Sequence, residues 1–215
     1  IAVEIHDNAT GCNDIGEIEA GCGITSCLPE GILITSQEQI DDFSLNYPEC
    51  SEIEGSVFIS GGAILNLDGL GNIQSIGGDL TLIYTSVTDL AGLQNLGSVG
   101  GALVIANNDN LFSLDGLNNL ATIGGEMTIS DSQFTDLSGL EGLTVIEGAL
   151  NVMYNPSLVD LSGIENLAEV QGDIMVSENE NLGSLLGLQG LETLSGGLEV
   201  SWSPSLTSLA GLENI

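Results

Sequence analysis

The dipeptide Gly-Leu or Gly-Ile recurs along most of this chain at a nearly constant spacing. Successive units are 23 or 24 residues long and share the template GLxxLxxIxGxLxIxxNxxLxxLx, beginning at Gly69, Gly92, Gly116, Gly139, Gly163, Gly187 and Gly211. A period of this length is typical of solenoid proteins. One coil cannot bury its apolar residues alone, so stacked coils must share a continuous core.

Each unit contains one segment in which apolar residues alternate, as a half-buried strand requires. The alternating pairs are Val57/Ile59, Leu80/Leu82, Leu103/Ile105, Met127/Ile129, Leu150/Val152, Ile174/Val176 and Leu198/Val200. The other apolar residues recur every three positions, which suits a chain turning corners around a narrow core. The pattern therefore predicts a mainly β fold, a parallel β-solenoid with rungs about 4.8 Å apart, so that seven coils span about 30 Å.

A different segment, residues 1–52, precedes the repeats, and we interpret it as an N-terminal cap of the same domain. Ile1–Ile5 alternates like a strand, and Ser36-Gln37-Glu38-Gln39 has the form of a capping box. The box predicts one short helix that ends before Pro48. The solenoid then comprises residues 53–215, about seven coils. The last unit, from Gly211, is incomplete and has no cap, which favours a chain that continues beyond Ile215 over subunits that stack end to end.

All four cysteines lie in the first quarter of the chain, at Cys12, Cys22, Cys27 and Cys50. An even, clustered number indicates two disulfides and an oxidising compartment, whereas a metal site would normally show paired Cys-x2-Cys spacing. Of the three connectivities, our interpretation pairs Cys12 with Cys22 and Cys27 with Cys50.

The charge of the chain excludes several classes of function. It has 31 acidic residues, one histidine and no lysine or arginine, which gives a net charge of −31. Nucleic acid and anionic membranes are excluded as partners, because both require basic residues. Phosphate clamps and Schiff-base lysines are excluded for the same reason. Repulsion among the carboxylates predicts a fold that tightens in salt.

The repeat units and the segment before them resemble known protein families. The GLxxLxxIxGxLxI…NxxLxxL unit is similar to the leucine-rich-repeat-like coils of receptor L-domain proteins. The lead-in CLPEGILITSQEQIDDFSLNYPECSEIEGSVFIS resembles bacterial cell-surface proteins of the Bacteroidota. The resemblance implies export, often by the type IX secretion route, and a role in surface attachment or ligand binding.

Asparagines recur at one template position, where a buried amide can hydrogen-bond the backbone of the adjacent coil. We expect a structural ladder of Asn108, Asn155 and Asn179, with Ser203 at the same position. Two oxygen-rich turns, Asn107-Asn108-Asp109-Asn110 and Glu178-Asn179-Glu180-Asn181, suggest calcium binding as a less favoured alternative, with Asp109, Glu178 and Glu180 as the candidate ligands. No other cofactor is expected.

Large apolar and aromatic residues alternate with the core residues of the strands and should point outward. Such contiguous faces are where solenoids bind partners. The expected ligand-binding face comprises Phe58, Thr81, Val104, Thr128, Asn151 and Met175, with Tyr84, Tyr154 and Trp202 at the strand ends. Few charges and several aromatics suit a glycan or a protein at the cell exterior. The alternative is that a loop or another domain covers this face.

Catalysis is the weaker interpretation. His6 lies alone beside Asp7, far in sequence from the serines that a catalytic triad would need. Asp79, Glu126 and Asp173 occur on alternate rungs, about 10 Å apart, near the upper limit for an inverting glycosidase pair. The sequence therefore favours a non-enzymatic extracellular or cell-surface module for adhesion or ligand binding. A structural subunit that self-associates through its open C-terminal end is the second hypothesis, and an acidic glycan hydrolase the third.

Overall fold

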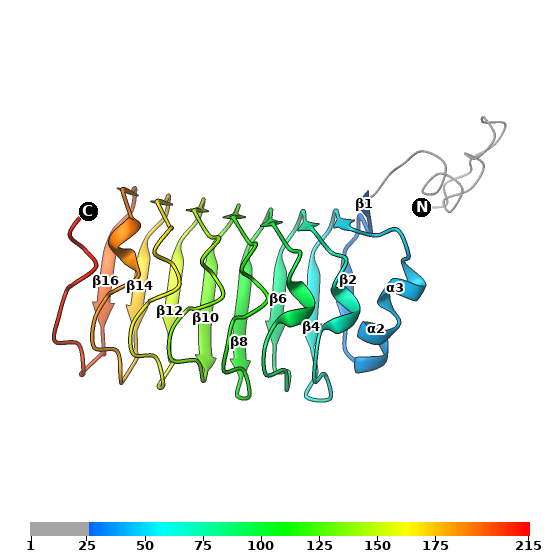
Figure 1. The fold of residues 1–215 in the computed structure, drawn as a ribbon, viewed down its shortest axis with the longest axis horizontal. Coiled ribbons are helices and arrows are strands. Elements are labelled where there is room, and N and C mark those ends of the chain that lie inside the picture. The colour runs from blue at the N-terminus through cyan, green and yellow to red at the C-terminus, as the bar shows by residue number, and fades with distance from the viewer. Residues whose placement is uncertain (1–25) are drawn as a thin grey trace.

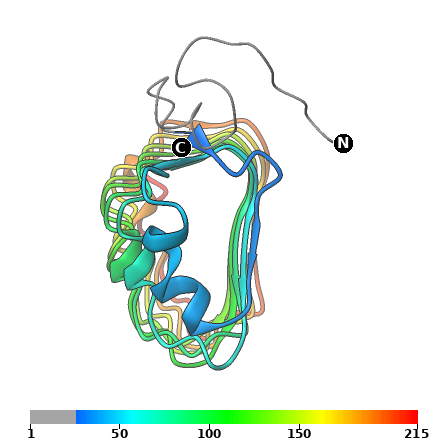
Figure 2. The same ribbon diagram turned by 90° about the vertical axis from the view of Figure 1, so that its right-hand side faces the viewer.

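The chain forms an elongated parallel β-solenoid in a computed structural model that describes residues 26–215. Figure 1 shows the coils stacked in a row, with the short helices at one end of the stack and the C-terminus at the other. Viewed down the stack, the coils superimpose into one closed outline, with long strands along one side and the helices on the opposite side (Figure 2). The predicted fold class is confirmed.

The longer strands form a parallel eight-stranded sheet. In chain order they are β2 (Ile32–Ile34), β4 (Val57–Ser60), β6 (Leu80–Ile83), β8 (Leu103–Asn108), β10 (Met127–Ser132), β12 (Leu150–Met153), β14 (Ile174–Ser177) and β16 (Leu198–Ser201). The register follows the repeat, so Leu80 pairs with Leu103 and Leu103 with Met127. Equivalent positions in successive units therefore form columns along the solenoid.

A second parallel eight-stranded sheet, which the sequence did not predict, precedes the first in every coil. Its strands have two residues each: β1 (Ser26–Cys27), β3 (Glu52–Ile53), β5 (Ser75–Ile76), β7 (Ser98–Val99), β9 (Thr122–Ile123), β11 (Val145–Ile146), β13 (Glu169–Val170) and β15 (Thr193–Leu194). The expectation of one strand per coil is corrected. A two-residue strand contributes a single inward side chain, so it produces no alternation to detect.

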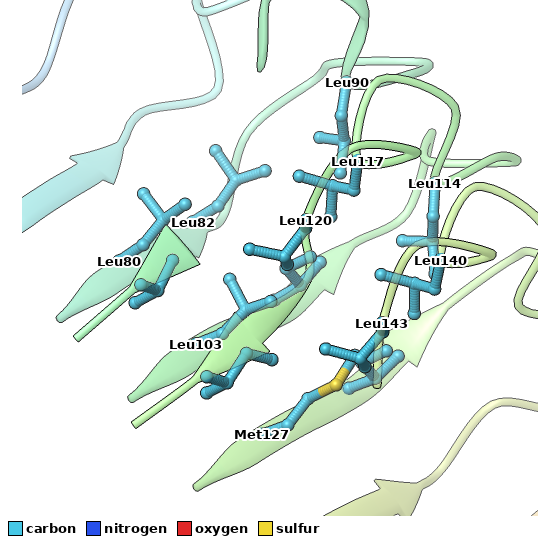
Figure 3. Close-up of a cluster of buried hydrophobic side chains, with 14 of the residues drawn as sticks. Leu80, Leu82, Leu90, Leu103, Leu114, Leu117, Leu120, Met127, Leu140 and Leu143 are labelled. Carbon is cyan, nitrogen blue, oxygen red and sulfur yellow. The ribbon is translucent and has the colours of Figure 1, made fainter. Parts of the chain in front are cut away.

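The core is a continuous column of aliphatic side chains between the strands and the opposite wall of each coil. Leu103, Met127 and Leu117 have no exposed surface. Figure 3 shows strand residues such as Leu103 and Met127 facing leucines such as Leu117 and Leu120. Three short 3-10 turns occur on the wall opposite the long strands: η1 (Asp68–Leu70), η2 (Ala91–Leu93) and η3 (Leu188–Gly190).

The repeating glycines are explained by how closely adjacent coils approach. A Cβ added to Gly139 would lie 2.3 Å from the carbonyl carbon and oxygen of Leu114 in the preceding coil, and Gly139 has a φ of +108°. At the other corner, a Cβ on Gly148 would lie 2.5 Å from the carbonyl carbon of Gly125. Only glycine fits such positions without moving the backbone.

The described part of the N-terminal cap, residues 26–52, contains two short helices where the capping box predicted one. They are α2 (Gln37–Asp41) and α3 (Phe43–Asn46), separated by Asp42, whose φ of −89° and ψ of 2° end the first helix. Ser36 accepts a hydrogen bond from the backbone N–H of Gln39, as the capping box predicts. In return, the Gln39 amide oxygen accepts from the backbone N–H of Thr35.

The helices close the first coil by packing their apolar side against it. Ile40 and Phe43 are buried, and the rings of Phe43 and Tyr47 lie 5.1 Å apart. Strands β1 and β2 lie within the predicted cap but pair with β3 and β4, so the cap itself supplies the first rung of both sheets.

The disulfide Cys27–Cys50 is present and joins β1 to the segment just before β3, with 5.6 Å between the two Cα atoms. This prediction is confirmed. The proposed Cys12–Cys22 bridge, the expected strand Ile1–Ile5 and His6 lie outside the described residues. At the other end, core positions of the last coil become partly exposed, and Leu209 is 63% exposed. No helix in residues 26–215 is long and apolar enough to cross a membrane.

Candidate functional site

The outward side of the sheet formed by β2 to β16, here called the strand face, presents its side chains in columns. The central column follows the register and comprises Leu33, Phe58, Thr81, Val104, Thr128, Asn151, Met175 and Glu199. Its neighbour comprises Ser60, Ile83, Ala106, Ser130, Met153, Ser177 and Ser201. Glu199 is the one charged residue in the two columns. The six expected central-column residues therefore lie side by side, and Leu33, which is 58% exposed, extends the column.

The two columns together, here called the central strip, combine apolar with hydroxyl and amide side chains. Phe58 is 38% exposed, while Thr81 and Val104 are half-buried. Asn151 donates a hydrogen bond across the sheet to the hydroxyl of Thr128, 3.2 Å away. The strip can offer apolar contact and a few hydrogen bonds to a ligand.

Carboxylates border the strip where the strands begin, and two of them have structural roles. One carboxylate oxygen of Asp79 accepts a hydrogen bond from the backbone N–H of Ala102 in the next coil, at 2.8 Å. Asp173 accepts in the same way from Gly197, at 2.7 Å. At the corner before the long strands, these side-chain carboxylates take the place of a backbone carbonyl as the hydrogen-bond acceptor for the next coil. The structure thus explains Asp79 and Asp173, two of the three acids that suggested a glycosidase pair.

At the opposite border, where the strands end, one residue in each coil adopts a left-handed conformation. From β6 to β16 these residues are Tyr84, Asn107, Asp131, Tyr154, Glu178 and Trp202, with φ between 51° and 58°. We call them the turn column. The three aromatic members are the ones expected from the sequence, and Tyr84, Tyr154 and Trp202 are 59%, 52% and 76% exposed.

The asparagine ladder lies directly beneath the turn column and is buried. Asn155 accepts a hydrogen bond from the backbone N–H of Ser132 at 3.2 Å and donates one to the carbonyl of Ile129 at 3.1 Å. Asn179 repeats this with Asn155 and Val152. Asn108 does so with Thr85 and Leu82. The ladder orients the exposed turn residues above it by fixing the backbone of each turn to the next coil.

The sequence analysis did not predict two further residues at the template position of the asparagine ladder. Thr85 and Ser132 are buried at the same position, in the two shorter units. Both residues lie at the same distance from the start of their strands as the ladder asparagines do, which could have identified them. They were missed because they are not asparagines. A second amide column on the opposite side was also missed. It comprises Asn95, Asn119, Asn166 and Asn214, each donating to a carbonyl of the preceding coil.

The candidate calcium ligands lie in two separate turns, as the sequence indicates. Asp109 follows β8, whereas Glu178 and Glu180 follow β14, three coils further along the solenoid. At about 4.8 Å per coil this separates Asp109 from the glutamates by about 14 Å, too far for one ion. Among residues 26–215, no group of three or more histidine, cysteine or acidic side chains is placed to hold a metal ion.

Comparison with known proteins gives one match. The family model for the receptor L domain matches residues 49–135 and, in an overlapping second segment, residues 98–185. Together the segments extend over more than half of the chain and include strands β4 to β14. No curated protein and no solved structure matches.

Proposed function

Because the chain belongs to the receptor L-domain family, a family of extracellular ligand-binding domains, we propose that it is a non-enzymatic module of the cell exterior that binds a protein or glycan through its strand face. The observation that carries the proposal is the central strip, in which apolar and hydroxyl side chains form two adjacent columns with a single charge. A strip of this kind leaves an apolar area open to solvent, which typically marks an interaction surface. The disulfide fits an oxidising compartment.

The repeat supports this function by making the face rigid. Every strand is bonded to both neighbours except at the two ends of the stack, and the buried ladder fixes the turns. A pre-organised surface loses little conformational entropy when a ligand binds. Adhesion follows if the ligand belongs to another cell or to a matrix.

The test compares two equal charge insertions, one on the strand face and one on the other sheet. The chain is screened against a glycan array and an array of extracellular proteins, and each ligand found is measured again with Val104→Glu and with Thr122→Glu. Val104 lies in the central strip, whereas Thr122 is an exposed residue of the other sheet. We expect Val104→Glu to weaken binding at least tenfold and Thr122→Glu to leave it unchanged, with equal melting temperatures. Equal affinities for the two variants would refute binding through the strand face.

A further inference from the structure

The turn column keeps side chains at positions where the backbone favours glycine. The left-handed backbone conformation is unfavourable for a residue other than glycine. Elsewhere the chain uses glycine for positive φ, as at Gly139 and Gly163, where a Cβ would collide with the preceding coil. In the turn column it places Tyr84, Tyr154 and Trp202 instead, and these aromatics are more than half exposed. Packing within the chain does not explain these aromatic residues, so we expect them to contact a ligand.

Trp202 forms an open pocket together with carboxylates of the preceding coil. The pocket has a volume of about 430 Å³ and is lined by Glu178, Glu180, Trp202, Ser203 and Pro204. Ser177 pairs with Ser201, so Glu178 and Trp202 are neighbours in the turn column, one coil apart. No described residue donates a hydrogen bond to the carboxylate of Glu178 or Glu180. Their acceptor oxygens are therefore open to a ligand, unlike those of Asp173.

The hydrogen-bonding groups of this pocket are mostly acceptors. Both glutamates only accept when ionised, and the Ser203 hydroxyl already donates to the carbonyl of Ser201, 3.2 Å away. The indole N–H of Trp202 is the one side-chain donor left. A sugar hydroxyl can also donate to these carboxylates, but it carries no charge and offers a single donor. A guanidinium group only donates, binds carboxylates in a fork and stacks on aromatic faces.

We propose that this pocket, here called the Trp202 pocket, binds an arginine side chain of a basic protein ligand. The proposal rests on the proposed function, because it names the partner class for the same side of the molecule. The net charge of −31 attracts a basic partner over long distances. A second copy of this chain cannot fill the pocket, because it has no arginine or lysine.

The experiment uses Trp202 as its own reporter, since it is the single tryptophan of the chain. The protein is titrated with Nα-acetylarginine amide while tryptophan emission is recorded. Nα-acetylglutamine amide and cellobiose serve as neutral probes. We expect saturation by the arginine probe in the millimolar range and no saturation by the neutral probes. Saturation by cellobiose alone would overturn the proposal in favour of a glycan site.

Matched variants separate the pocket from the general negative charge. Glu178→Gln and Glu180→Gln should each raise the dissociation constant about two- to fivefold, as for exposed ion pairs. Asp109→Asn and Asp131→Asn remove the same charge from turns of other coils and should leave the constant unchanged. Equal effects of all four variants would show a counter-ion atmosphere and refute a site.

Trp202→Gly supplies the last control, because glycine suits the local φ of 51°. This variant should melt at the same temperature as the parent or higher, yet lose binding of the arginine probe in a calorimetric titration. Binding that persists would overturn the role of Trp202. Val104→Glu should not alter the arginine titration, so failure of the strand-face test and failure of the Trp202 pocket can be told apart.

Discussion

Replacing Asn155 by alanine tests whether the buried ladder stabilises the solenoid. The Asn155 side chain has no exposed surface and makes two hydrogen bonds to the preceding coil, with the N–H of Ser132 and the carbonyl of Ile129. Alanine leaves the Ser132 N–H buried without this acceptor, which costs about 1–3 kcal/mol. Loss of the second bond adds about 1 kcal/mol. We therefore expect a loss of about 2–4 kcal/mol in the free energy of unfolding.

The matched control is Asn166→Ala, on the opposite side of the same coil. Asn166 also donates to a carbonyl of the preceding coil, that of Glu141 at 2.8 Å, but its side chain is exposed. Water replaces the amide there, so the loss should remain below about 1 kcal/mol.

The assay is urea denaturation of both variants and the parent, followed by hydrogen exchange at the Ser132 amide. A loss of 2–4 kcal/mol lowers the melting temperature by about 5–15 °C in a domain of this size. Exchange at Ser132 should accelerate in Asn155→Ala and remain slow in Asn166→Ala. Equal destabilisation by the two variants would refute the reasoning, because burial would then not distinguish the two amides.

Four further perturbations have expected outcomes. Cys50→Ser should cost about 3 kcal/mol from loop closure and open the cap before the middle coils, which proteolysis of the cap would detect. Gly139→Ala should destabilise by well over 1 kcal/mol in thermal unfolding, because φ is +108° and the preceding backbone blocks the Cβ. The melting temperature should rise between low salt and 1 M NaCl at pH 7, and a flat profile would contradict carboxylate repulsion. Burial raises the pKa of Asp136, but hydrogen bonds from Ser138 and Thr135 outweigh it and the net pKa is lowered. This carboxylate therefore stabilises the fold above about pH 4 and loses that contribution as the pH falls through its folded pKa. The difference in the free energy of unfolding between the parent and Asp136→Asn should therefore become smaller in acid.

The sequence predicted the long strands well because each presents two or more inward side chains at a spacing of two. Leu103 and Ile105 are an example, and both are buried. The short strands could not be predicted, since Thr122–Ile123 has only one inward residue. The division of the capping helix at Asp42 depends on a single backbone conformation that the capping box does not encode.

The strand face was predicted more fully than the Trp202 pocket, and the difference has a physical cause. Residues of the face share one template position, so the repeat brings them together by register alone. The pocket combines positions that differ in the template, Glu180 beyond a turn and Trp202 within the next one. Their proximity depends on the left-handed conformation at Glu178 and Trp202. The sequence does not predict this conformation, because neither residue is a glycine.

A chain without lysine or arginine needs another way to stabilise its carboxylates, and the repeat supplies it through backbone N–H groups. Asp79 accepts from Ala102 in the next coil, and Glu141 accepts from Gly139 within its own turn. A hydrogen bond to an ionised acceptor is stronger than a neutral one, so these acids stabilise the fold without an ion pair. Glu178 and Glu180 have no such donor among the described residues. The same charge therefore serves two purposes. Where a backbone N–H faces it, the carboxylate fixes a turn or joins two coils, and where none does, it remains available to a cationic partner.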